Sequence, residues 1–295
     1  MPISGWMGDN LIKKSENMGW WNGAEIVLPN KEKITVTTLN DALEMMVQIP
    51  ERSSSAIMRT PISGIYKIKG VGDVLTGRIE QGSVKPGDEV VFLPTHTTAN
   101  PCQGKVFSIE MHNKNVEAGT SGDNCGFNIK QLVKENMPRV GDIMILKKDE
   151  TIGRAYSFTA QVRVLEHPGE LKVGYCPIAF VRTGRSAVRM SAINWKIGKE
   201  SGNTKVANPA CLKANEMGEA VFEPMQPFVV DTFKNCEGLG RVAIMEGASV
   251  IMLGKVTAVD FKEKVKEETP KTVGKPGAKP ENKAAKPTGK AVTKK

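Results

Sequence analysis

Residues 65–93 show the clearest alternation of apolar and polar positions in the chain, and they predict three strands joined by two turns. A period of two, most regular at residues 74–79, is typical of a strand with one face in a core. Gly70 and Gly72 flank the first turn, where glycine accepts a positive φ at little cost. The second turn is the sequence Lys-Pro-Gly-Asp at residues 85–88, in which proline presets φ and glycine accepts the reversed residue.

The dipeptide Gly-Asp precedes three apolar segments, at residues 87–88, 122–123 and 141–142. Short strands with turn signals at regular spacing predict a small β-barrel or sandwich. A second series of about six strands follows between residues 156 and 259. A polar, serine-rich stretch at residues 51–59 is a candidate linker in front of the first series.

Residues 39–47 carry apolar side chains at helical spacing, with Thr38 as the N-cap and Pro50 as the stop. The apolar face of this helix has no obvious cover in the chain. We interpret residues 1–52 as the last strand and helices of a larger α/β domain whose beginning is absent. The alternative is a native helical extension that packs on the β modules.

Residues 262–295 contain 11 lysines, 4 glutamates and almost no apolar residues, so we expect a disordered tail that cannot bury enough surface to fold. This tail carries +7 of the net charge of +9, which leaves +2 for the rest of the 295 residues. A domain that bound nucleic acid through its general field alone would be more basic. An anion bound by the body is therefore expected at a local site.

The sequence contains no run of about 18 apolar residues that would predict a membrane span, and no secretion signal is visible. The five cysteines are odd in number and lack Cys-x-x-Cys spacing. They favour free thiols in a reducing cytosol over a disulfide framework. We expect a cytoplasmic protein without a membrane partner.

A complete nucleotide-binding or catalytic motif is missing from the sequence. A phosphate-binding loop needs glycines followed by Lys and Ser or Thr, and the sequence Gly-Lys-Glu-Ser at residues 198–201 lacks this order. No catalytic residue is predicted. His96, Cys102 and His112 could converge on a metal, but their spacing matches no zinc pattern, so ordinary surface residues are favoured and no metal site is predicted.

Polar residues gather where one strand of the first β module is expected to end and another to begin. Glu110 and His112 close one strand, and Asp123 with Asn124 opens the next. A glutamate at a strand end is usually solvated, and Asp-Asn is usually turn chemistry. The residues alone therefore favour a structural role over a ligand site.

Several short motifs together resemble translation elongation factor 1-alpha. The resemblance covers about residues 2–259 in one order, and residues 95–103 and 184–187 are more similar to the divergent elongation factor-like relative. The motifs are Tyr66-Lys-Ile-x-Gly-x-Gly72, Gly77-Arg-Ile-Glu80, Val84-Lys-Pro-Gly87, Val106-x-Ser-Ile-Glu-Met-His112, Gly122-Asp-Asn-x-Gly-Phe-Asn128, Phe158-Thr-Ala-Gln-Val162, His167-Pro-Gly169, Gly174-Tyr175 and Leu239-Gly-Arg-x-Ala243.

The resemblance implies a GTPase domain followed by two tandem six-stranded antiparallel β-barrels, and hence an all-β fold for most of this chain. It places a remnant of the GTP-binding domain with a linker helix in residues 1–52. The two barrels are then expected in residues 53–150 and 151–261, and the basic tail in residues 262–295.

Ser4, Gly5 and Trp6 match the family's last guanine-contacting element, so they are the candidate GTP-binding residues. GTP with Mg²⁺ is the cofactor of an intact family member. The phosphate loop, the switch regions, the Mg²⁺ ligands and the Asn-Lys-x-Asp element have no counterpart in this sequence. We therefore expect that this chain alone neither binds nor hydrolyses GTP.

Three residues of the first barrel match family positions that hold aminoacyl-tRNA. Glu110 matches a glutamate that lies against the terminal adenosine, and His112 matches a histidine beside the esterified amino acid. Asn124 matches an asparagine that bonds the backbone of that amino acid. Asn113 stands where bacterial relatives have arginine, so one charged contact is not expected here.

Two residues of the second barrel complete the candidate tRNA site. Gly247 matches a position where the tRNA backbone approaches closely. Arg241 is a retained arginine, for which a role in packing is an equal alternative. Met245 replaces a family arginine, which removes one phosphate contact.

The leading hypothesis is a piece of a factor that delivers aminoacyl-tRNA to the ribosomal A site with GTP and is served by a guanine-nucleotide exchange factor. The alternative is a stand-alone, non-catalytic double barrel that binds RNA or protein. A third possibility, actin as a partner, rests only on the positive charge of the tail. This charge is weak support, because most lysine-rich tails stay solvated.

Overall fold

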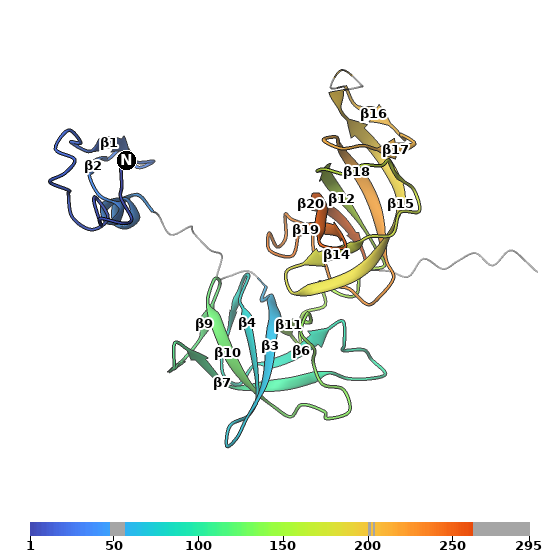
Figure 1. The fold of residues 1–295 in the computed structure, drawn as a ribbon. Helices are drawn as coiled ribbons and strands as arrows, with labels where there is room; N and C mark the ends of the chain where they lie inside the picture. Colours follow the sequence, from blue (N-terminus) through green and yellow to red (C-terminus); the bar gives the residue numbers. More distant parts are fainter. Residues whose placement is uncertain (48–56, 200–201, 203, 262–295) are drawn as a thin grey trace, which may run out of the picture.

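Strands make up most of the regular structure in this computed structural model, which describes residues 1–47, 57–199, 202 and 204–261. The chain forms a small N-terminal unit and two β modules (Figure 1). The predicted linker at residues 51–59 falls mostly, and the predicted tail at residues 262–295 entirely, outside the described residues. Within the described residues, no helix is long and apolar enough to cross a membrane.

The N-terminal unit consists of one hairpin and one short helix. Strand β1 (Ala24–Val27) pairs antiparallel with β2 (Lys33–Val36), and α1 (Leu39–Asp41) continues into a π-helical turn, η1 (Ala42–Met46). Thr38 is the N-cap, as predicted: its side chain accepts from Asp41 N at 3.1 Å, and the Asp41 carboxylate accepts from Thr38 N at 2.9 Å. This reciprocal pair is a capping box. Hydrogen bonds from Thr37 and Thr38 lower the pKa of Asp41 to about 2.

Barrel 1, residues 60–146, is a closed ring of six strands. The ring order is β10-β4-β3-β11-β6-β7, every neighbour is antiparallel, and the pairing of β10 with β7 closes it. The short β8 extends from β7, and β5 pairs with β9 in a separate two-stranded sheet. The strands are β3 (Thr60–Ile68), β4 (Gly72–Arg78), β5 (Ser83–Val84), β6 (Glu89–Leu93), β7 (Gln103–Met111), β8 (Lys114–Val116), β9 (Gly119–Thr120), β10 (Asn124–Lys130) and β11 (Ile143–Leu146).

Barrel 2, residues 157–260, repeats the same architecture. Its ring order is β14-β19-β20-β12-β18-β15, closed by the pairing of β14 with β15. The prediction of two six-stranded antiparallel barrels is therefore confirmed. The strands are β12 (Ser157–Val164), β13 (Leu171–Lys172), β14 (Ile178–Val181), β15 (Gly184–Ile197), β16 (Val206–Ala207), β17 (Cys211–Leu212), β18 (Met217–Pro224), β19 (Arg241–Glu246) and β20 (Ser249–Asp260).

The three Gly-Asp dipeptides form one recurring turn. The glycine has a φ of 98° at Gly87, 98° at Gly122 and 100° at Gly141, which a side chain would strain. In each turn the aspartate carboxylate accepts a hydrogen bond of 2.8 or 2.9 Å from the backbone N–H three residues earlier. The pairs are Asp88 with Lys85, Asp123 with Thr120, and Asp142 with Arg139. Glycine and aspartate thus act together to start the strand that follows.

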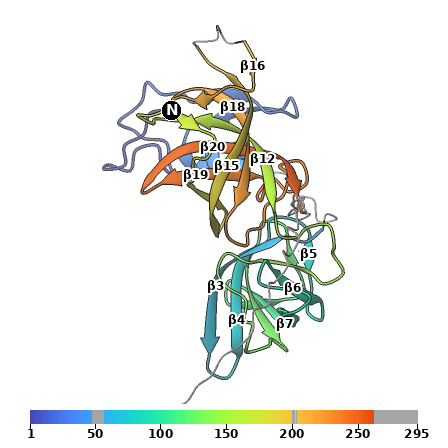
Figure 2. The same ribbon diagram turned by 90° about the vertical axis from the view of Figure 1, so that its right-hand side faces the viewer.

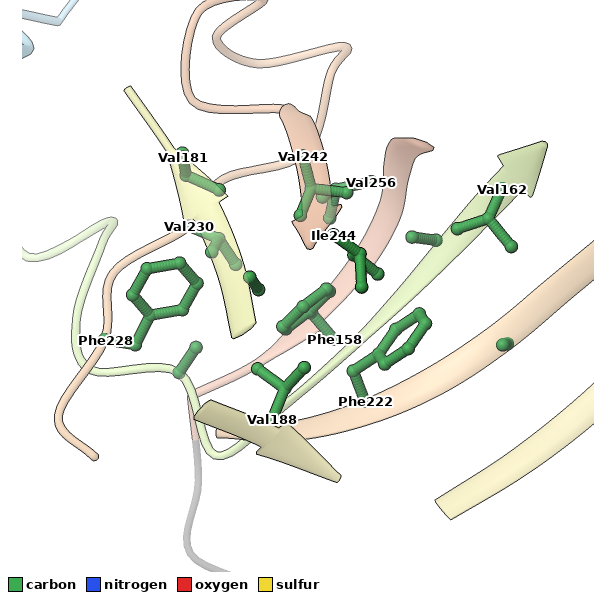
Figure 3. Close-up of a cluster of buried hydrophobic side chains, with 14 of the residues drawn as sticks. Phe158, Val162, Val181, Val188, Phe222, Phe228, Val230, Val242, Ile244 and Val256 are labelled. Atoms are coloured by element: carbon green, nitrogen blue, oxygen red, sulfur yellow. The ribbon is translucent and has the colours of Figure 1, made fainter. Parts of the chain in front are cut away.

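The core of barrel 2 consists of side chains that point inward from alternate positions along its strands (Figure 3). In β12, Phe158 and Val162 are buried and point inward, whereas Gln161 between them faces out. The rings of Phe158 and Phe222 stack with their centroids 5.4 Å apart. Burying side chains of this size stabilises the fold by about 1.5–3 kcal/mol each.

Two strands of barrel 1 are buried on both faces, and this is where the barrels meet. Met144 of β11 lies in the core of barrel 1, whereas Ile143 and Ile145 on its other face belong to the buried cluster of barrel 2. Val91 of β6 joins the same cluster. Barrel 2 therefore packs directly against barrel 1, as the turned view shows (Figure 2).

Replacing Asp88 by alanine removes the hydrogen bond that fixes the first Gly-Asp turn. We expect the free energy of unfolding, measured by urea denaturation, to fall by about 1 kcal/mol, the usual net contribution of one hydrogen bond. Glu117→Ala is the matched control, because this exposed side chain accepts no hydrogen bond from the described residues. Equal stability of the two variants would contradict a role for the aspartate in the turn.

Candidate nucleic-acid interface

An open pocket of about 350 Å³ lies on the outer surface of barrel 1. Three predicted residues, Glu110, His112 and Asn124, line it together. The other lining residues come from β3, β4, the β7–β8 turn and β10: Ser63, Thr76, Gly77, Asn113, Cys125 and Gly126.

The pairing of β7 with β10 brings these residues together. Glu110 lies opposite Gly126 on one side, and Thr76 of β4 lies opposite Gly126 on the other. Along β10 the odd positions Cys125 and Phe127 are buried, so Asn124 and Gly126 face outward. Because Gly126 has no side chain, the floor between Glu110 and Thr76 stays bare.

The β7–β8 hairpin presents His112 in a strained conformation. His112 and Asn113 have φ values of 51° and 60°, and Met111 pairs with Lys114 across them. Two consecutive residues with positive φ make a two-residue turn of the type that favours Asn-Gly. Residues other than glycine are uncommon in this region, and backbone strain of this kind concentrates at functional sites. The turn places His112 among the residues that line the pocket.

Neighbouring residues Asp123 and Asn124 have different tasks. The Asp123 carboxylate accepts from Thr120 N at 2.9 Å and from its hydroxyl at 2.8 Å, which is turn chemistry. The side chains of Asn124 and Glu110 are exposed and have no hydrogen-bond or ion-pair partner among the described residues. Asp123 therefore has the structural role in a turn that the sequence favoured, while the side chains of Asn124 and Glu110 are available to a ligand.

The sequence did not predict Ser63 and Thr76 as lining residues. The Ser63 hydroxyl donates to the Thr76 carbonyl at 3.1 Å, and the two hydroxyl oxygens are 3.3 Å apart. The alternation at residues 74–79 puts Thr76 on an outward face. No local pattern shows that this face adjoins β10, because the strand pairing is set by the whole barrel.

The remaining predicted tRNA residues lie on barrel 2, outside the pocket. Gly247 joins β19 to β20 with a φ of 58°, and a Cβ built on it would meet no atom within 4 Å, so its backbone is openly accessible. Arg241 pairs with Glu237 and lies 5.6 Å from the centre of the Phe233 ring. It lines a second depression, of about 670 Å³, together with Arg163 and Lys255.

Most of the other candidate residues do not line either depression, and these are Ser4, Gly5, Trp6, His96 and Cys102. Ser4 forms an isolated β-bridge with Asp9, and Trp6 is 96% exposed. His96 Nδ1 accepts a hydrogen bond from Cys102 N at 2.9 Å, whereas His112 lines the pocket. Burial raises the pKa of the Cys102 thiol to about 12. No group of three or more metal-ligating side chains occurs within the described ranges.

Family models match each barrel separately. Residues 72–145 match the model described as elongation factor Tu domain 2, and residues 157–257 match that described as GTP-eEF1A C-terminal domain-like. A solved structure of Sup35 complexed with GDP superimposes with a TM-score of 0.63 at 22% identity, over 88% of this chain and 58% of that chain. The structural likeness shows the same fold.

Curated relatives match over most of the chain. Elongation factor 1-alpha of Pyrococcus horikoshii is 37% identical over 262 residues, which are 88% of this chain and 58% of the relative. That of Serendipita indica is 35% identical over 89% of this chain and 56% of the relative. The oocyte form of Xenopus laevis is 34% identical over 95% of this chain and 59% of the relative. The chain thus spans under two thirds of their length.

Two packed six-stranded barrels, each matched by a translation-factor model, place the chain among the translation factors. The curated relatives narrow the class. The chain belongs to the elongation factor 1-alpha family.

Substitutions at His112 test the strained turn. Glycine has no Cβ penalty at a φ of 51°, so we expect His112→Gly to keep or raise the free energy of unfolding, by up to about 1 kcal/mol. His112→Val places a β-branched residue there and should lower it by about 1–3 kcal/mol. Urea denaturation measures both. A larger loss for glycine than for valine would show that the ring itself holds the turn together.

Proposed function

We propose that the pocket on barrel 1 binds the aminoacylated 3′ end of tRNA, as part of a translation elongation factor that delivers aminoacyl-tRNA to the ribosomal A site. The observation that carries this proposal is the convergence of Glu110, His112 and Asn124 in one open pocket. These residues come from two strands and a turn, and they match the family positions that hold the charged end of the tRNA.

The chemistry of the pocket suits a carrier that accepts every amino acid. Such a site must bind what all its ligands share, namely the terminal adenosine, the ester and the amino-acid backbone. Glu110 supplies a carboxylate acceptor for the adenosine, and Asn124 an amide that can both donate and accept toward the amino-acid backbone. His112 lies beside the esterified residue. The open mouth leaves room for side chains of any size.

Barrel 2 contacts the T stem in this proposal. The accessible backbone at Gly247 allows a phosphodiester to approach closely, since no side chain stands in its way. Arg241, on the same barrel, contributes positive charge that favours the RNA backbone. Its ion pair with Glu237 and its contact with Phe233 support a packing role as well.

In this proposal, GTP is bound and hydrolysed by a part of the whole factor that lies outside the region matched in the relatives. We propose GTP with Mg²⁺ as the cofactor of the whole factor, and the ribosome and a guanine-nucleotide exchange factor as its partners. The Sup35 structures, complexed with GDP or GMPPNP, are of a protein with the same barrel fold. We also propose domain boundaries at residues 53–150 and 151–261, which contain β3–β11 and β12–β20.

The proposed pocket makes Glu110→Ala the decisive substitution. We expect it to weaken binding of aminoacyl-tRNA by about tenfold or more, because it removes a charged acceptor that bonds the adenosine. Protection of the aminoacyl ester from hydrolysis, titrated with protein, measures this binding. Lys294→Ala in the basic tail is the control for charge, and we expect it to change the affinity by less than about twofold.

Equal losses for Glu110→Ala and Lys294→Ala would mean that the pocket is not the binding site. Loss of affinity for uncharged tRNA equal to that for aminoacyl-tRNA would place the contact on the RNA stem instead of its aminoacylated end.

A further inference from the structure

A buried cluster of charges lies where the two barrels meet. Arg59, Asp149 and Asp231 have side-chain exposures of 3%, 3% and 7%. Arg59 immediately precedes β3 of barrel 1, Asp149 lies between the barrels, and Asp231 follows β18 of barrel 2. Together with Thr151 these residues are called the Arg59 cluster below.

The Arg59 guanidinium is bound from several sides. Its Nη1 donates to the Asp149 carboxylate and, at 2.9 Å, to the Met58 carbonyl. Its Nη2 donates to the Thr151 hydroxyl at 2.8 Å. Its Nε lies 4.0 Å from Asp231 Oδ2 and has no hydrogen-bond partner in the described part of the chain. The planar group therefore joins barrel 1 to the connecting segment and faces a carboxylate of barrel 2.

The two carboxylates respond differently to this environment. Burial works to raise the pKa of Asp149, but hydrogen bonds from Thr151 and the charge of Arg59 outweigh it and hold the pKa below its usual value. Burial raises the pKa of Asp231 despite its own hydrogen bonds. Asp149 is thus the principal counter-ion of Arg59.

A second polar link crosses the same junction. Arg182 of barrel 2 donates to Glu80 of barrel 1 at 2.7 Å. Gly238 of barrel 2 lies so close to the Glu80 carboxylate that a Cβ on it would overlap the carboxylate. Glu80 N in turn donates to the Arg59 carbonyl at 2.9 Å. The Arg59 cluster and this ion pair therefore form one continuous polar contact between the barrels.

The apolar contact at Val91, Ile143 and Ile145 already supplies attraction between the barrels. Burying ions in place of apolar groups seldom adds net stability. Hydrogen bonds to a planar guanidinium do fix direction, which apolar contacts do not. The hydrogen bonds of Arg59 to Asp149 and Thr151 therefore fix how the connecting segment leaves barrel 1. The ion pair of Arg59 with Asp231 and the hydrogen bond of Arg182 to Glu80 reach barrel 2 directly. Together these contacts are suited to set the orientation of barrel 2 on barrel 1.

We propose that Arg59 is a positioning residue, which holds the pocket of barrel 1 and the Gly247 turn of barrel 2 in the one arrangement that lets a single tRNA occupy both. This inference rests on the proposed function. Binding at the second site is then intramolecular, so fixed geometry raises the affinity for a ligand that spans both sites and leaves a ligand of one site unaffected.

The test compares a short and a long ligand on the full 295-residue chain. Phenylalanyl-adenosine reaches only the pocket, whereas Phe-tRNA reaches both sites. The main variant, Arg59→Met with Asp149→Asn and Asp231→Asn, removes all three charges together, so that no buried ion is left unpaired. We expect its affinity for Phe-tRNA to fall by about tenfold or more and its affinity for phenylalanyl-adenosine to change by less than about twofold.

A milder pair of variants covers the case in which the triple variant fails to fold. Arg182→Ala breaks the ion pair between the barrels, and Arg189→Ala breaks an exposed ion pair with Glu223 within barrel 2. We expect Arg182→Ala to weaken binding of Phe-tRNA more than Arg189→Ala does, with equal affinities for the short ligand. Calorimetry provides a second readout, in which loosened barrels unfold in two transitions instead of one.

Each outcome decides between the proposals. Equal losses for both ligands would make the Arg59 cluster a merely structural support and overturn the positioning role. Unchanged binding of Phe-tRNA by the triple variant and by Arg182→Ala would overturn it as well. If the wild-type protein binds both ligands equally tightly, binding at a second site is refuted and the positioning role with it, while binding at the pocket is supported. Binding of neither ligand would refute the proposed function, and this inference with it.

Discussion

The hydrogen bonds between β7 and β10 are the constraint on which barrel 1 and its pocket depend. They close the ring of six strands, and they also set Glu110 opposite Gly126, two residues from Asn124. A shift of one residue would turn every outward side chain of β10 into the core. The same strand register therefore determines both the closure of the barrel and the geometry of the pocket, because it buries Phe127 and exposes Asn124.

The residues that shape the pocket divide into those that the fold needs and those that it tolerates. Asp123 completes a turn that recurs twice elsewhere in barrel 1, so its role follows from architecture. His112 lies in a conformation that glycine or asparagine would adopt at lower cost. The strained backbone at His112 and the open pocket that this residue lines are together the argument for a ligand at this position.

The sequence predicted the strands well because their signals are local. Alternation along β4, the Gly-Asp turns and the Thr38 cap depend on neighbours within a few residues, and each was confirmed. The pairing of β7 with β10 could not be read locally, and neither could the contribution of Ser63 and Thr76 to the pocket. Residues 51–59 were interpreted as a linker, yet Arg59 at their end is buried beside two carboxylates, Asp149 and Asp231, from two other parts of the chain.

The segment Ile143-Met144-Ile145 shows why the junction of the barrels was also beyond local reasoning. An uninterrupted apolar strand is compatible with burial on both faces, but the sequence does not say what covers the second face. Here barrel 2 covers it, and the Arg59 cluster lies in the same junction. Apolar contact is not directional, so it holds the barrels together without favouring one angle, whereas the hydrogen bonds of Arg59 to the connecting segment and the Arg182–Glu80 ion pair are directional. Together they join two separately closed barrels, which is the structural basis of the proposal that one elongated ligand binds to both.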